Sequence, residues 1–244
     1  MKNKEKWYEE WFDTKYYQLL YEHRSFGEAE QFIKKLVQKL KLKSETRILD
    51  MACGNGRHAL ALAKYGFRVT GIDLSSSNIQ WAKQFESEKL KFLQSDMRVP
   101  LNEKFDLILN LFSSFGYFFS DEENEKVIQS VSFMLADDGN FLLDYLNVYQ
   151  VFVGSSDWMT VEKDNVVFKI QKIVNKNEII KNIVVEDSGN QYKYHEYLKK
   201  YDLSFFEKIF QKFRLKIECI WGDYELNEFD LHSSPRLIMV AKKV

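Results

Sequence analysis

The feature that most constrains this chain is a short apolar run that passes through two glycines into a helical pattern. Residues 46–51 have the length and apolar content of a buried strand, and Gly54 and Gly56 follow at once. Apolar residues at helical spacing, including Ala59 and Leu62, begin directly after this loop. Glycine lets the backbone turn sharply and lets a ligand approach without a Cβ in the way. Because ligands of open α/β sheets bind beyond the carboxyl ends of the strands, the loop is a candidate binding site.

Strand and helix patterns alternate along the first 150 residues. Helices are expected within 7–40, after Gly56, from Ser75 or Ser76 to 86, and over 121–135, with a turn at 137–139. Further strands are expected at 67–72, 90–93, 105–112 and 141–146. This alternation predicts a Rossmann-like α/β fold with a mainly parallel sheet covered on both faces.

The pattern changes after residue 148. Apolar residues alternate with period two over 158–201, and turn signals lie at 175–177 and 188–190, which predicts a small antiparallel β-sheet. A helix at 203–213 and strands at 215–222 and 236–242 then complete the main sheet. We therefore expect one domain made of 1–147 and 202–244, with a helical cap over 1–40. Residues 148–201 are expected to form an inserted antiparallel subdomain, and the cap and the insertion are the natural lids.

Composition excludes several classes of function. The net charge is −1 and the pI is near 6.5, so there is no electrostatic footprint for nucleic acid. No apolar stretch reaches about 18 residues, so no membrane span is expected. Cys53 and Cys219 are too few for a zinc site or a disulfide framework. These features predict a cytoplasmic protein without a metal.

Asp50 helps to decide what the glycine loop binds. The spacing of Gly54, Gly56 and Ala59 also fits a dinucleotide fingerprint, so the loop by itself is ambiguous. A carboxylate at the strand end would repel a pyrophosphate and attract an ammonium, which favours a cofactor with a cationic aminoacyl group. Capping of the loop's own amides by Asp50 is the alternative.

Two further acids follow the next two strands. Asp73 lies nineteen residues after Gly54, close to the spacing at which an acid hydrogen-bonds ribose hydroxyls, and the alternative is an N-cap for the helix at Ser75. Asp96 is placed to accept from an adenine amino group while Met97 packs on the ring, and an ordinary turn is the alternative.

These residues support a family resemblance. The chain resembles the class I S-adenosylmethionine-dependent methyltransferases over about 46–146 and the last two strands. The segments that carry the resemblance are 49–56 (Leu-Asp-Met-Ala-Cys-Gly-Asn-Gly), 71–75 (Gly-Ile-Asp-Leu-Ser), 95–98 (Ser-Asp-Met-Arg) and 110–112 (Asn-Leu-Phe). Ala52 stands where many members have glycine. Segments 53–58, 110–117, 234–236, 11–17 and 20–24 resemble a bacterial subgroup of small-molecule methyltransferases.

The resemblance implies the sheet order 3-2-1-4-5-7-6 with an antiparallel seventh strand, and S-adenosylmethionine as the cofactor, which leaves as S-adenosylhomocysteine. The cofactor-binding residues expected from the acids, the glycines and these motifs are Tyr17, Asp50, Ala52, Gly54, Asn55, Gly56, Arg57, Asp73, Leu74, Asp96, Met97, Asn110, Leu111 and Phe112. The expected partner is a small-molecule methyl acceptor, with neither nucleic acid nor membrane, and the chain is expected to be a monomer or a homodimer.

Candidates for the acceptor side are less specific. Phe112, Phe115, Tyr117 and Phe118 follow the fourth strand and either line the mouth of the site or pack the loop. The substrate-side candidates are Phe115, Tyr117, Tyr21 and Arg236, and Arg236 is equally suited to an internal ion pair. Tyr16, Tyr17 and Tyr21 either close over the donor or pack in the core.

The identity of a general base stays open. Tyr117 and His195 are the leading candidates, and Glu196, His232 and Asp144 are further ones, while packing or a cofactor contact suits His58 better. Two other functions compete with methyl transfer. An NAD(P)-dependent oxidoreductase is disfavoured by Asp50 and Asp96, and a catalytically silent nucleotide-binding module is disfavoured by the intact acids and glycines.

Overall fold

The main sheet has seven strands, in the order implied by the resemblance. The computed structural model describes residues 6–22 and 25–244. The strands are β1 (Arg47–Met51), β2 (Arg68–Asp73), β3 (Leu90–Gln94), β4 (Phe105–Asn110), β5 (Leu135–Leu146), β11 (Leu215–Trp221) and β12 (Arg236–Lys243). Their spatial order is β11-β12-β5-β4-β1-β2-β3, and β12 runs antiparallel to both neighbours. The order 3-2-1-4-5-7-6 and the antiparallel seventh strand are therefore confirmed.

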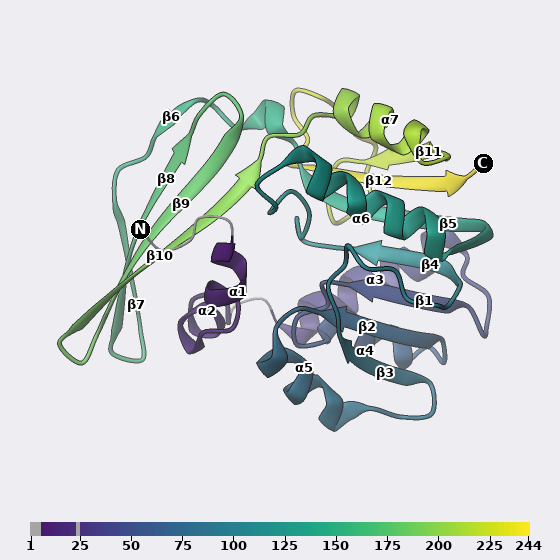
Figure 1. Ribbon diagram of the computed structural model, residues 1–244, viewed down its shortest axis with the longest axis horizontal. Helices are drawn as coiled ribbons and strands as arrows, with labels where there is room; N and C mark the ends of the chain where they lie inside the picture. Colours follow the sequence, from purple (N-terminus) through teal and green to yellow (C-terminus); the bar gives the residue numbers. More distant parts are fainter. Residues whose placement is uncertain (1–5, 23–24) are drawn as a thin grey trace.

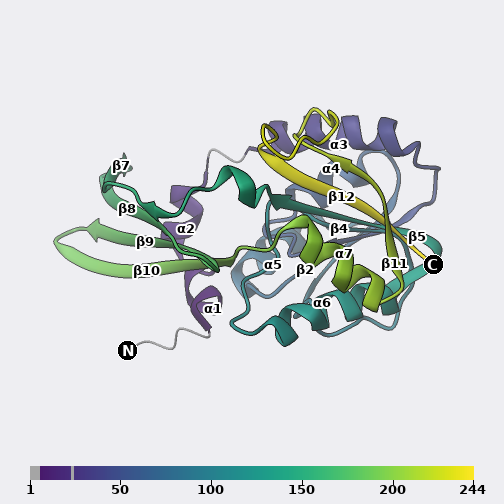
Figure 2. The ribbon, with the colours of Figure 1, turned by 90° about the horizontal axis from the view of Figure 1, so that it is seen from above.

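Helices cover both faces of this sheet, which explains why its strands are apolar on both sides (Figure 2). The helices are α3 (Phe26–Leu40), α4 (Arg57–Ala63), α5 (Ser76–Ala82), α6 (Asp121–Met134) and α7 (Leu203–Lys212), with single 3-10 turns at Lys83–Phe85 and Val148–Gln150. Ile48 of β1 packs in one core with α3, α4 and α5, and its neighbour Leu49 packs in the other with α6 and α7. Successive strand residues point to opposite faces, so Asp50 lies on the α4 side.

The second sheet is antiparallel, as the period-two pattern predicts. It contains β6 (Gly154–Ser155), β7 (Met159–Lys163), β8 (Val166–Val174), β9 (Glu178–Asp187) and β10 (Asn190–Lys199). The order is β10-β9-β8-β6, and β7 also pairs with β8. The expected turns at 175–177 and 188–190 join β8 to β9 and β9 to β10. The division of the chain into one domain with an inserted subdomain at 148–201 stays a prediction.

The helices α1 (Trp7–Trp11) and α2 (Lys15–Leu20) lie between the two sheets (Figure 1). Trp11 Nε1 donates to a Glu196 carboxylate oxygen at 2.8 Å, which ties α1 to β10. On the other side, an Asp13 carboxylate oxygen accepts from Ser75 Oγ at 2.5 Å and from Ser77 Oγ at 2.6 Å, at the start of α5. The α1–α2 part of the expected helical cap thus contacts the second sheet and the start of α5, although residues 1–5 and 23–24 of the cap lie outside the described residues.

One local expectation is wrong. The turn expected at 137–139 lies within β5, which begins at Leu135 directly after α6. The β4–β5 register shifts between the pairs Phe105–Leu135 and Leu107–Asn140, so residues 136–139 bulge out of the ladder. Asp138 adopts a left-handed φ of 63° there, which is the turn chemistry that the sequence suggested.

Among the described helices, none combines the length and the apolar content that a membrane span requires.

Candidate functional site

A cavity of about 1020 Å³ lies where β1, β2 and β4 end, and α1 and α2 contribute to its walls. Residues expected to bind the cofactor that line it are Tyr17, Asp50, Ala52, Gly54, Asn55, Arg57, Asp73, Leu74, Asp96, Met97, Leu111 and Phe112. The volume is at the upper end of ordinary small-molecule sites. The carboxyl ends of parallel strands therefore converge on one pocket, as expected for an open α/β sheet.

The two glycines of the loop after β1 have different tasks. A Cβ at Gly54 would meet nothing within 4 Å, so the backbone there is open to a ligand. A Cβ at Gly56 would lie 2.6 Å from the Phe92 ring, and Gly56 does not line the cavity. Gly56, with a φ of 79°, therefore permits close packing of α4 against β3. Ala52 also adopts a left-handed φ, of 56°, at the position where many class I methyltransferases carry glycine.

Asp50 is an almost fully buried carboxyl group with an incomplete set of partners. Its exposed fraction is 1%, and its Oδ2 atom has no hydrogen-bond partner among residues 6–22 and 25–244. Burial raises the pKa of Asp50 to about 7, against the lowering effects of Arg57 and of the Ala59 N–H. A cation bound in the cavity would both satisfy Oδ2 and favour the ionised form. The site therefore fits a ligand that brings an ammonium group.

Asp73 is held at the end of β2 by the backbone. Its two carboxylate oxygens accept from the N–H groups of Gly54 and Ser75, each at 2.8 Å. The N-cap of α5 is Ser75, whose Oγ accepts from Asn78 N at 3.1 Å, so the alternative role of Asp73 as the helix cap is wrong. Burial raises the pKa of Asp73 despite these bonds. Each oxygen keeps a lone pair for a ligand hydroxyl.

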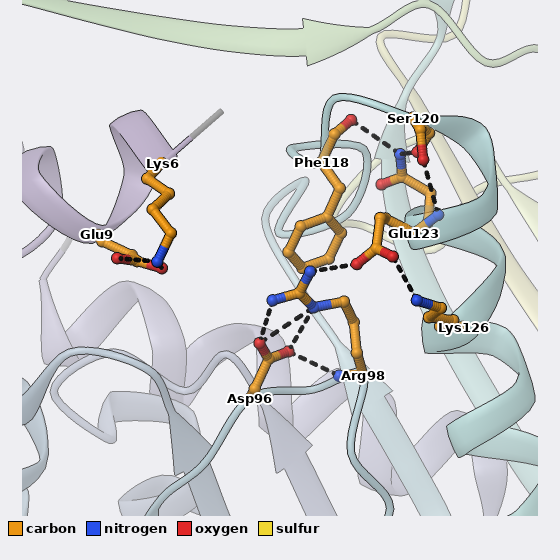
Figure 3. Close-up of polar contacts among 9 residues, drawn as sticks. Lys6, Glu9, Asp96, Arg98, Phe118, Ser120, Glu123 and Lys126 are labelled. Carbon is orange, nitrogen blue, oxygen red and sulfur yellow. Dashed lines mark hydrogen bonds and ion pairs between the residues drawn. The ribbon is translucent and has the colours of Figure 1, made fainter. Parts of the chain in front are cut away.

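Asp96 both forms a turn and pairs with a cation. Its carboxylate faces the guanidinium of Arg98, which also donates to Glu123 and lies against the Phe118 ring (Figure 3). Burial by itself would raise the pKa of Asp96, but the bonds from Arg98 outweigh it and the pKa is lowered. Arg98 N also donates to Asp96 Oδ1 at 2.9 Å, which is the turn that the sequence left open. Asp96 is thus a fixed, ionised acid on the cavity wall.

Aromatic rings from the loop after β4 divide between the cavity and the core. Phe112, Tyr117 and Phe118 line the cavity, whereas Phe115 does not. Phe115 is fully buried and packs against Tyr145 and other rings of the core beside α7, so its expected substrate-side position is wrong. The reversal of the backbone between Phe112 and Phe115 sends the two rings to different places.

His58 lines the cavity next to Phe112, and its ring lies 5.0 Å from the Phe112 ring in a stacked arrangement. Its Nε2 atom is buried and has no partner within the part of the chain that the structure describes. Burial, with Arg57 adding to it, lowers the pKa of His58 well below its usual value, which keeps the ring neutral. A neutral imidazole in the lining of the same cavity adds a second polar atom that a bound ligand can satisfy.

Several other candidates lie away from the cavity lining. Asn110 is buried beneath it, and its amide donates to Met51 O at 3.4 Å. His195 is exposed on β10 and bonds Asn182, and His232 is exposed in the loop before β12. Glu196 accepts from Trp11, as above, and from the Tyr21 hydroxyl at 2.7 Å, while Tyr21 itself lines the cavity. These positions disfavour His195 and His232 as bases.

Arg236 and Asp144 form an internal ion pair, with Nη2 and Oδ1 2.6 Å apart. Of the two alternatives for Arg236, the ion pair is therefore the one observed. Tyr16 is buried and donates to Asp187 at 2.9 Å, so it belongs to the packing of α2 on the second sheet.

Four lining residues from α1 and the segment after it are not predicted as site residues by the sequence. Tyr8, Glu9, Phe12 and Asp13 line the cavity, although they are far in the sequence from the strand-end residues that line it. No local spacing signals that Asp13 will meet Ser75, which lies 62 residues later.

Known proteins with similar sequences and folds bear on this site. Residues 48–139 match the family model of a methyltransferase domain. A glycine/sarcosine N-methyltransferase of Aphanothece halophytica is 34% identical over 147 residues, which cover 57% of this chain and 54% of that protein. The chain thus spans about half the length of the curated relatives it matches.

Solved structures with this fold cover nearly all of the chain. An S-adenosylmethionine-dependent methyltransferase from Clostridium acetobutylicum has a TM-score of 0.77 at 21% identity, covering 93% of this chain and 96% of that one. An amino pentose methyltransferase from Micromonospora echinaspora, solved with S-adenosylmethionine bound, has a TM-score of 0.68 at 17% identity, covering 95% and 98%. The matched segment 48–139 contains Asp50, Gly54, Asp73 and Asp96, whose backbone positions this fold brings to one cavity. Residues 48–139 are thus similar to methyltransferase domains, and the fold of the chain is that of S-adenosylmethionine-dependent methyltransferases.

Proposed function

We propose that this protein transfers a methyl group from S-adenosylmethionine to a small-molecule acceptor. The observation that carries the proposal is the buried Asp50 Oδ2 atom, which lacks a partner among the described residues at the wall of the cavity. A carboxylate in that state attracts an ammonium group and repels a pyrophosphate, which favours an aminoacyl nucleoside over a dinucleotide.

The acids at the strand ends suit the parts of this cofactor. Asp50 would accept from its ammonium group, Asp73 from its ribose hydroxyls, and Asp96 from its adenine amino group, with Met97 against the ring. S-adenosylmethionine, when bound, supplies an electrophilic methyl group on a sulfonium. The protein's own contribution is to fix the two reactants in line and to exclude water from between them.

The acceptor side of the cavity is aromatic. Tyr8, Phe12, Tyr17 and Tyr117 line it, and ring faces tolerate a neighbouring cation while excluding water. The Asp13 bonds to Ser75 and Ser77 join the α1–α2 segment to the start of α5 beside this cavity. A pocket covered in this way supports a small acceptor over a macromolecule. The relatives include enzymes whose names state an amino acid or an amino sugar as acceptor, which agrees with that size.

A general base is required only for acceptors that bind in protonated form. Of the two leading candidates, Tyr117 lines the cavity and His195 is exposed on β10, so Tyr117 is the base we propose. A cytoplasmic location and a monomeric or homodimeric state stay predictions.

Thermal unfolding in the presence of ligands tests the cofactor. S-adenosylhomocysteine is expected to raise the melting temperature, because it binds the folded state. Asp73→Ala is expected to abolish the shift. Asp106→Ala is the matched control, because Asp106 lies at the opposite end of the sheet, on β4, and pairs with Arg47. A larger shift with NAD would overturn the assignment in favour of an oxidoreductase.

The acceptor is tested by incubating the protein and S-adenosylmethionine with panels of amines, phenols and carboxylic acids, and measuring S-adenosylhomocysteine by mass spectrometry. Formation of S-adenosylhomocysteine with at least one small molecule, and its loss in Asp73→Ala, are expected. Cofactor binding without turnover of any acceptor would favour a silent binding module, and turnover only with protein or RNA would contradict the small-molecule acceptor.

A further inference from the structure

The loop after β4 contains two consecutive non-glycine residues in the left-handed conformation. The φ angles of Phe112 and Ser113 are 58° and 60°. This region is unfavourable for residues with a side chain, because Cβ crowds the following carbonyl oxygen. Phe and Ser tolerate this region less well than Gly, Asn or Asp, so two of them in a row indicate surrounding contacts that hold them in place.

Asp144 of β5 supplies the contacts that hold this turn. It is fully buried, and its Oδ2 atom accepts from Phe112 N at 2.7 Å and from the Tyr224 hydroxyl at 3.0 Å. Its Oδ1 atom accepts from Arg236 Nε at 2.8 Å and Nη2 at 2.6 Å. Its backbone carbonyl accepts from Ser113 N at 3.0 Å, so the backbone N–H groups of Phe112 and Ser113 both donate to Asp144. We call Asp144, Tyr224 and Arg236 the brace.

Arg236 completes the brace from β12. Its Nη2 atom also donates to Ser113 Oγ at 2.8 Å, so the turn is held through a side chain as well as through its amides. None of the three brace residues is among the residues that line the cavity. All three also lie outside the 48–139 segment that matches the methyltransferase family model.

The Phe112 ring connects the turn that the brace holds to the wall of the cavity. The Phe112 ring stacks with the His58 ring, at a centroid distance of 5.0 Å, and with the Tyr224 ring, at 4.9 Å. The guanidinium carbon of Arg57 lies 4.3 Å from its centroid. Phe112, His58 and Arg57 all line the cavity, so a displaced turn would rearrange one wall.

We propose that the brace residues are positioning residues that hold the Phe112–Ser113 turn in its left-handed form and thereby set the affinity of the cavity for the cofactor. The inference rests on the proposed function, since it takes the cavity as the S-adenosylmethionine site. The brace acts through the wall and touches no ligand itself.

Isothermal titration with S-adenosylhomocysteine tests this role. Asp144→Asn keeps the shape of the side chain but replaces one acceptor oxygen by an NH2 group, which then faces other donors. The affinity for S-adenosylhomocysteine is expected to fall at least tenfold. Tyr224→Phe removes a single donor from a partly exposed residue, and a smaller loss of about threefold is expected. Leu142→Val is the matched control, because Leu142 lies two residues earlier on the same face of β5. It is expected to lower stability and leave the dissociation constant unchanged.

A second pair of variants separates positioning from general support of the fold. In the Asp144→Asn background, Ser113→Gly is expected to recover at least threefold in affinity, because glycine adopts the left-handed conformation without a penalty. Ser113→Ala loses the same hydroxyl but keeps a Cβ, so no recovery is expected. A brace that merely stabilised the fold would lower the melting temperature without this difference between glycine and alanine.

The outcomes distinguish the two proposals. Wild-type protein that fails to bind S-adenosylhomocysteine overturns the proposed function and the brace with it. Wild-type protein that binds, with Asp144→Asn and Tyr224→Phe both within twofold of it, overturns the brace alone. If Asp144→Asn does not fold, Tyr224→Phe decides, and the glycine and alanine substitutions at Ser113 are compared in that background.

Discussion

Asp50→Asn is expected to make the ligand-free protein more stable relative to wild type as the pH rises from 5 to 8. In the folded protein the pKa of Asp50 is raised from its ordinary value of 3.8 to about 7 by burial. Below pH 3.8 the carboxyl group is protonated in both states, and folding is not opposed by it. Between pH 3.8 and 7 the unfolded chain ionises while the folded one stays protonated, so stability is lost as the pH rises.

The size of this effect follows from the pKa difference. The full loss above pH 7 is about 4 kcal/mol, at about 1.4 kcal/mol for each pKa unit. Asparagine does not titrate, so the advantage of Asp50→Asn over wild type should grow by about 2.5 kcal/mol between pH 5 and pH 8. For a chain of this length that corresponds to a difference in melting temperature of roughly 5–10 °C. Effects of the substitution that do not depend on pH, such as an unsatisfied amide on the new side chain, change the free energy of unfolding by the same amount at every pH. They leave the increase between pH 5 and pH 8 unchanged.

Urea unfolding followed by tryptophan fluorescence at pH 5, 6, 7 and 8 measures the free energy of unfolding of both proteins. Other titrating groups are shared and cancel in the difference. Asp106→Asn is the control, because the bonds from Arg47 lower the pKa of Asp106, and both of its states are ionised over this range. The control difference should therefore be flat. A flat difference for Asp50→Asn as well would refute the reasoning from burial.

Two further predictions follow from the same geometry. The affinity of the wild-type protein for S-adenosylhomocysteine, measured by calorimetry, should fall as the pH drops below 7, because the ammonium group binds the ionised form of Asp50. The fall should approach tenfold for each pH unit, and Asp50→Asn should lack this dependence. Gly71→Ala would place a Cβ 2.6 Å from the Phe92 ring, so a loss of about 1–3 kcal/mol in the free energy of unfolding is expected. An unchanged midpoint of urea unfolding would show instead that the Phe92 ring moves aside without cost.

Much of the fold was predictable because its signals are local. Parallel strands covered on both faces have short runs of apolar residues, and the strands of the antiparallel second sheet alternate apolar and polar residues. Both sheets are therefore predicted from the residues themselves. The strand order was not, since periodicity carries no information about neighbours, and it came from the family resemblance. The bulge at 136–139 was missed because a turn signal does not say whether the chain leaves the sheet or rejoins it.

The site divides in the same way. Asp50, Gly54 and Asp73 were placed together in advance, because the carboxyl ends of parallel strands meet at one edge. Asp13 could not be placed, since its partners are more than 60 residues away. The aromatic run after β4 shows the limit most clearly. Phe112 and Phe115 are equivalent by composition, and the left-handed turn at Phe112 decides which ring faces the cavity.

Asp50 and Asp144 show how two buried acids can differ in their sets of partners. Both lie near strand ends and are almost inaccessible, with exposed fractions of 1% and 0%. Asp144 is surrounded by donors, three of which come from Tyr224 and Arg236, 80 and 92 residues away. Asp50 keeps one oxygen without a partner among the residues with described positions. A buried carboxylate whose oxygens all meet donors has its desolvation cost offset by the fold itself, whereas one that lacks a donor opposes folding until a cation binds. Sequence spacing cannot separate these cases, because it does not show which distant residues will reach each acid. The missing partner of Asp50, seen only in the folded chain, is what supports the proposal that Asp50 binds the ligand.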